Sequence, residues 1–108
     1  DKKAIMDFLR QVHYAKGFQE FHIATAKAGY RKEKTHEFAF IHSTFHALQI
    51  LKLLGKEEYN RYLKEAKELV QLHKHNKGFG VQITVKDYNY GPCVTPYETL
   101  CATLILLS

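Results

Sequence analysis

The sequence predicts a mainly α (α+β) protein, in which an antiparallel three-helix bundle is followed by a short β-strand or hairpin and a short apolar C-terminal helix. Apolar residues recur every three or four positions through most of the chain, as helices with one buried face require. Glycines stand where these patterns stop, and one later stretch alternates apolar with polar residues, as a strand does. At 108 residues, the chain has the length of a single domain with one core.

The first helix is predicted over residues 2–28. Gly17 lies inside this pattern, where it indicates a bend or a wide buried face, and Gly29 stands at the position of a C-cap. The apolar positions before Gly17 have the spacing of one helical face: Ile5, Phe8, Leu9, Val12 and Ala15.

The second and third helices are predicted over residues 34–54 and 56–75. The second is apolar around most of its circumference, which is typical of a central helix. Glu57 and Glu58 suit the positive N-terminal end of the third. Because only Gly55 separates the two helices, we expect them to be antiparallel neighbours.

The C-terminal third differs in character. Alternating apolar and polar residues predict a strand at about 80–86, and residues 87–92 then indicate a turn or loop. The sequence leaves the partner of this strand open: residues 93–95, the C-terminal run, or the same strand of a second protomer.

A last helix is predicted at about 96–107. Thr95 and Glu98 have the spacing of a capping box, and Pro96 occupies the first helical position. A strand over residues 99–107 is the alternative, because Thr, Cys, Ile and Leu are compatible with either state.

Composition limits the class of protein. The formal net charge is +5, no run of about 20 apolar residues could cross a membrane, and two cysteines are too few for a disulfide framework. We therefore expect a cytoplasmic protein without a membrane segment.

Basic residues converge on one end of the predicted bundle. In an up-down-up arrangement, the end of the first helix, the start of the second and the end of the third share one pole. This basic pole is a candidate site for anions and nucleic acid, although basic residues also favour helix C-termini. Its candidates are Lys27, Arg31, Lys32, Lys34, His36, Lys74 and Lys77.

Histidines offer two further patterns. His36, His73 and His75 would meet at the same pole and are a candidate zinc set. His42 and His46, spaced i and i+4, continue a polar stripe and are expected to face solvent.

The segment from Arg31 to His36 resembles the Arg-x4-6-His motif of the HEPN family of helical ribonucleases. The resemblance covers six residues and implies that Arg31 would hold the scissile phosphate while His36 acts as acid or base. Lys32 stands where that family usually has a smaller polar residue, and the C-terminal strand region is not part of its bundle. The spacing alone does not assign the chain to the family.

Tyrosines gather in the uncharged C-terminal third. Tyr88, Tyr90 and Tyr97 are candidate anchors for a protein partner, since aromatic side chains bury a large area at a small cost in rotamer entropy. No dense catalytic constellation or cofactor motif is present in the sequence. The leading hypothesis is therefore a small non-catalytic binding or regulatory protein that acts through a protein partner, without a cofactor. Its alternatives are a nucleic-acid-binding protein and a His-dependent metal or ribonuclease-like enzyme, and homodimerisation is a further expectation.

Overall fold

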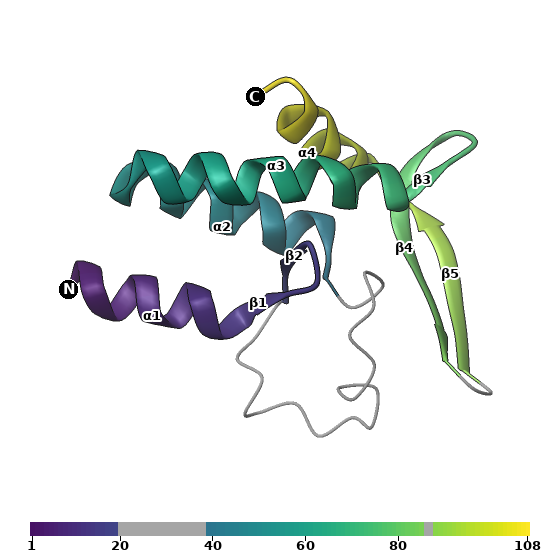
Figure 1. Ribbon diagram of the computed structural model, residues 1–108. Helices are drawn as coiled ribbons and strands as arrows, with labels where there is room; N and C mark the ends of the chain where they lie inside the picture. The colour runs from purple at the N-terminus through teal and green to yellow at the C-terminus, as the bar shows by residue number, and fades with distance from the viewer. Residues whose placement is uncertain (20–38, 86–87) are drawn as a thin grey trace.

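The computed structural model describes residues 1–19, 39–85 and 88–108. In these residues the protein is mainly helical, with four helices and small antiparallel sheets. Figure 1 shows the helices gathered side by side, with a long β-hairpin extending from one end of the helical body. The elements are α1 (Lys2–Val12), β1 (His13–Tyr14), β2 (Gly17–Phe18), α2 (Ile41–Leu54), α3 (Lys56–Leu72), β3 (Lys74–His75), β4 (Gly78–Val85), β5 (Tyr88–Val94) and α4 (Pro96–Leu106).

The prediction of one helix over residues 2–28 is wrong, because α1 ends at Val12 and a tight β1–β2 hairpin follows. This hairpin inserts Phe18 into the core, where it is almost completely buried. Thr44 Oγ1 accepts the N–H of Phe18 at 2.9 Å, and Ser43 Oγ donates to the carbonyl of Phe18 at 2.6 Å. Local spacing favoured a helix, but these contacts with α2 satisfy the hairpin backbone instead.

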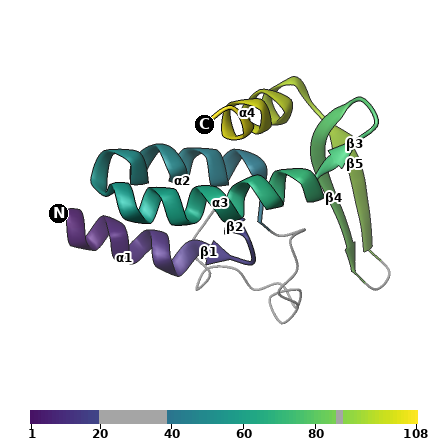
Figure 2. The same cartoon turned by 45° about the horizontal axis from the view of Figure 1, so that its top comes forward.

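Helices α2 and α3 form the predicted antiparallel pair across Gly55 (Figure 2). Their predicted bounds need correction. α2 starts at Ile41 rather than at residue 34, with Phe40 as its N-cap, while residues 34–38 lie outside the described part of the chain. α3 ends at Leu72 rather than at residue 75, because Lys74 and His75 pair with β4.

The predicted strand is confirmed with longer bounds, as β4, and its partner is β5. A loop was predicted where β5 begins, because Gly91 and Pro92 are poor strand residues. Among the described residues β5 is an edge strand, so the missing N–H of Pro92 breaks no ladder. Gly91 has φ +92° and lies close to the carbonyl of Val81, where the register between the strands shifts.

Helix α4 is confirmed, and the strand alternative for residues 99–107 is wrong. Thr95 Oγ1 accepts the N–H of Glu98 at 3.0 Å, and Pro96 occupies the first turn, as the capping pattern predicted. α4 packs against both α2 and α3. The predicted three-helix bundle is therefore not confirmed, because α4 packs with the other helices instead of following them as a separate element. Within the described residues, the model contains no helix with the length and apolar character needed to span a bilayer.

Candidate functional site

Two histidines of α2 are bonded to the first turn of α4. The Glu98 carboxylate accepts from the backbone N–H of His42 at 3.2 Å and is also hydrogen-bonded to His42 Nδ1. One turn further along α2, His46 Nε2 is hydrogen-bonded to the hydroxyl of Tyr97. The expectation that both imidazoles face solvent holds for His46, which is exposed, but is wrong for His42, which is half-buried against Glu98.

Tyr97 and Cys101 complete this cluster and remain protonated at neutral pH. Partial desolvation of the Tyr97 hydroxyl against α2 raises its pKa, and its interaction with Cys101 raises this pKa further. Burial also raises the pKa of the Cys101 thiol, against an opposing effect of the hydrogen bond with Tyr97. A thiol with a raised pKa is a poor nucleophile. The cluster therefore serves to join helices and has no activated nucleophile among its described groups.

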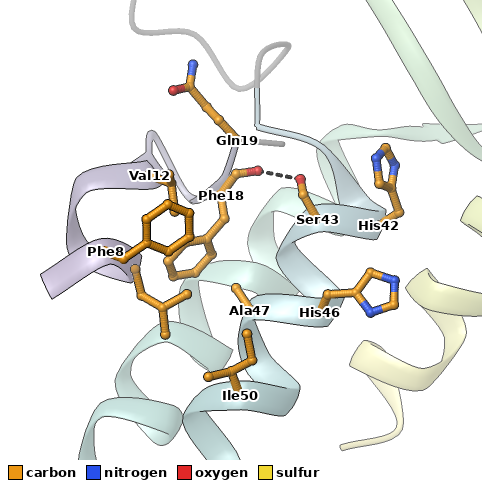
Figure 3. Close-up of a pocket in the computed structure, with 10 residues that line it drawn as sticks. Phe8, Val12, Phe18, Gln19, His42, Ser43, His46, Ala47 and Ile50 are labelled. Carbon is orange, nitrogen blue, oxygen red and sulfur yellow. Dashed lines mark hydrogen bonds between the residues drawn. The ribbon is translucent and has the colours of Figure 1, made fainter. Parts of the chain in front are cut away.

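An apolar pocket of about 380 Å³ lies beside this cluster, between α1, β2 and α2. Figure 3 shows Phe8, Val12 and Phe18 gathered at one side, while the rings of His42 and His46 turn away toward α4. The lining is completed by Leu9, Gln19, Ser43, Ala47 and Ile50. The hydroxyl of Ser43 donates to the carbonyl of Phe18, so the interior of the pocket offers mainly apolar contact.

Exposed apolar side chains follow two ridges, one on α2 and one on α4, that begin at the His46–Tyr97 contact, and we call these two ridges together the apolar face. Residues 97, 100, 104 and 107 are spaced three, four and three apart, so they lie within one narrow arc of α4. Residues 50 and 53 extend the outer ridge of α2 from His46, whose bond to Tyr97 links the two helices. The apolar face consists of Ile50 and Leu53 of α2, Tyr97, Leu100 and Leu104 of α4, and Leu107 at the C-cap of α4, all exposed.

No protein-family model, curated protein or solved structure matches this chain. Function has to be inferred from the surfaces of the chain itself.

The basic pole falls largely outside the described residues. Lys74 and Lys77 are exposed beyond the end of α3. The described residues therefore do not test whether the predicted pole assembles, and anion binding there stays a prediction. The candidates that lie outside the described residues are Lys27, Arg31, Lys32, Lys34 and His36, which include both residues of the HEPN-like spacing.

The predicted zinc set is described only in part. His73 is buried and hydrogen-bonded through Nδ1 to the carbonyl of Gly80 at 3.1 Å, which fixes its ring against β4. His75 is half-buried, and His36 lies outside the described residues. Within residues 1–19, 39–85 and 88–108, no group of three or more His, Cys, Asp or Glu is arranged to hold a metal.

Of the three candidate tyrosines, Tyr97 is exposed and belongs to the apolar face. Tyr88 and Tyr90 lie on β5, and the structure does not describe their side chains. The sequence-based reasoning missed Leu100, Leu104 and Leu107 as surface residues. Their three-four spacing with Tyr97 was the available signal, but spacing alone does not show which side of an apolar helix is exposed.

Proposed function

We propose that this chain is a small non-catalytic binding protein that regulates or links a protein partner through the apolar face. The exposed leucines of the two ridges carry this proposal. Leu100 and Leu104 of α4 are 54% and 41% exposed, and Leu53 of α2 is 86% exposed. Exposed apolar side chains that lie next to each other are typical of interaction surfaces, whereas single ones are common on any protein.

Charge supports a protein partner over nucleic acid at this surface. The only charged residue of α2 is Lys52, whose ammonium lies 6.0 Å from the ring centroid of Tyr59 on α3. The only charged residue of α4 is Glu98, which is buried against His42. Binding to phosphates depends on lysine and arginine, and the apolar face contains neither.

The pocket supports an apolar anchor over a polar metabolite. Pockets for polar ligands hold a few polar groups that converge on the ligand. Here Ser43 is bonded to the hairpin, and His42 and His46 are bonded to α4. Gln19, whose buried Oε1 has no hydrogen-bond partner among the described residues, is therefore the one remaining polar side chain of the lining. A large apolar side chain from a partner suits such a pocket, since binding energy at interfaces concentrates on side chains of this kind.

The test is capture of partners from a lysate of the source cells, with and without nuclease treatment. We expect the wild-type chain to retain a protein after nuclease treatment and the variant Leu104→Glu to lose it. Gln71→Glu, an exposed position on α3 with the same change of charge, is the matched control and should retain the protein. Retention that disappears with nuclease, or that survives in Leu104→Glu, would contradict the proposal.

A further inference from the structure

We propose that the occupant of the apolar face is a second copy of this chain, so that the protein is a two-fold symmetric dimer. This inference rests on the proposed function, because it names the partner of the same surface. In the dimer, α4 of each protomer lies over the α2 ridge and the pocket of the other.

The arrangement of the apolar face permits this reciprocal contact. The stripe of α4 begins at Tyr97 on one side of the His46–Tyr97 contact, and the α2 ridge with Ile50 and its pocket lies on the other. A two-fold axis that runs along this boundary, in the plane of the interface, places each stripe on the partner's ridge at the same time. One contact is therefore made twice, and it closes the assembly at two protomers.

The exposed area is sufficient for a stable dimer. If a fully exposed large side chain presents about 200 Å², the six residues of the apolar face expose roughly 700 Å². A standard interface buries about 800 Å² per partner, and homodimer interfaces are about 65% apolar. The apolar face thus supplies the apolar part of such an interface, with a polar rim from its surroundings.

Charge also permits self-association at this face. Each chain carries a formal net charge of +5, so two copies repel each other over most approaches. The apolar face contributes no charge to that repulsion. Added salt screens the remaining charges and is therefore expected to strengthen the dimer, whereas binding to nucleic acid would weaken with salt.

Sedimentation velocity over a concentration range of about 1 to 500 µM tests the assembly. We expect wild type and Gln71→Glu to form dimers, and Leu104→Glu to dissociate at least about 30-fold more readily, as the loss of an interface hot spot does. Leu104 is exposed, so this variant should fold, and circular dichroism checks that it does.

A pair of opposite charges tests the reciprocal geometry. Ile50→Lys and Leu104→Glu should each be monomeric alone. Their equimolar mixture should form a heterodimer, because the ammonium introduced at position 50 of one chain then meets the carboxylate introduced at position 104 of the other, while the second contact stays wild type.

Each failure has its own meaning. A wild-type chain that is monomeric throughout the range overturns the dimer. A monomer that still captures a partner through Leu104 leaves the proposed function standing and overturns only the identity of the occupant. A mixture without heterodimer overturns the reciprocal contact.

Discussion

Glu98, a buried residue of α4, caps the N-terminus of α2 by binding both the backbone N–H and the imidazole of His42. The N-cap residue of α2 is Phe40, which makes no side-chain cap hydrogen bond. The carboxylate therefore supplies from another helix what a local Ser, Thr or Asp would provide, at the end where the helix dipole favours negative charge. This contact fixes α4 on α2 and thereby orients the stripe of the apolar face.

We expect Glu98→Ala to lower the free energy of unfolding by about 1 to 3 kcal/mol, because it leaves a part-buried N–H of α2 without its acceptor. Glu98→Gln should lose less, since an amide oxygen still accepts one hydrogen bond. Urea denaturation measures both variants. Equal stability of Glu98→Ala and wild type would show that water caps α2 as well as the carboxylate does.

Gly17 should tolerate no side chain. A Cβ at this position would lie 2.5 Å from Leu69 Cδ2 and closer still to Thr44 Oγ1, both buried. We expect Gly17→Ala to destabilise the fold by about 1 to 3 kcal/mol, because the hairpin must move away from α2 and α3.

Gly55 provides the matched control for Gly17. No atom lies within 4 Å of a Cβ built there, and its φ of −168° suits any residue. Gly55→Ala should therefore be neutral or stabilise by up to about 1 kcal/mol, by reducing the entropy of the unfolded chain. Thermal unfolding of both variants measures their Tm. Equal shifts in Tm for Gly17→Ala and Gly55→Ala would contradict the close packing of the hairpin at Gly17.

Ala15 occupies a strained backbone conformation in the β1–β2 turn, with φ 55°. The left-handed region costs a residue with a Cβ about 1 to 2 kcal/mol, and glycine does not incur this cost. Glycine also has a larger conformational entropy in the unfolded chain, and this offsets part of the gain. We therefore expect Ala15→Gly to raise the free energy of unfolding by roughly 0.5 kcal/mol. A chemical denaturation midpoint below that of wild type would contradict this expectation.

His13 should make stability fall at acid pH. It lies between the rings of Phe18 and Tyr62, with centroids 5.2 and 4.9 Å away. Burial lowers the pKa of the imidazole, and the charge of Arg61 lowers it further against the opposing effect of Glu65. The unfolded chain, with a pKa near 6.5, then binds a proton more readily than the folded chain. Folding free energy is therefore lost as the pH falls below about 6.5.

The measurement is the free energy of unfolding of wild type and His13→Gln between about pH 7.5 and pH 5. The difference between the two curves carries the result, because it isolates the contribution of residue 13. We expect the variant to lose less stability on acidification. Parallel curves would mean that the pKa of His13 is the same in the folded and the unfolded chain, which would contradict the prediction.

Elements defined by long or chemically specific local patterns could be predicted. The α2–α3 pair, the strand around Ile83 and the capping of α4 by Thr95 all appear where expected. The end of α1 could not be predicted, because Phe18 fits a helical stripe as well as it fits the core through a hairpin. Residues 93–95 were one of the partners proposed for the predicted strand, and Cys93 and Val94 do pair with β4. The rest of β5 was expected to be a loop, because the tolerance of Pro92 depends on its place at a sheet edge.

For the candidate site, the sequence predicted Tyr97 as an anchor for a partner, and the structure shows that this residue is exposed, but the sequence did not predict the surface to which it belongs. Local spacing shows that residues 97, 100, 104 and 107 share one face of a helix. It does not show which face of an apolar helix is buried. α4 carries apolar residues on both sides, and only its packing through Cys101, Ala102 and Ile105 leaves the leucines outside.

The sequence by itself therefore determined the helical class, the antiparallel pair and the cap of α4, because these depend on periodicity and on contacts between near neighbours in the chain. Only the tertiary structure decided where α1 ends, what pairs with β4 and which side of α4 faces solvent. These outcomes depend on contacts between distant segments, such as that of Glu98 with His42, which no local pattern encodes.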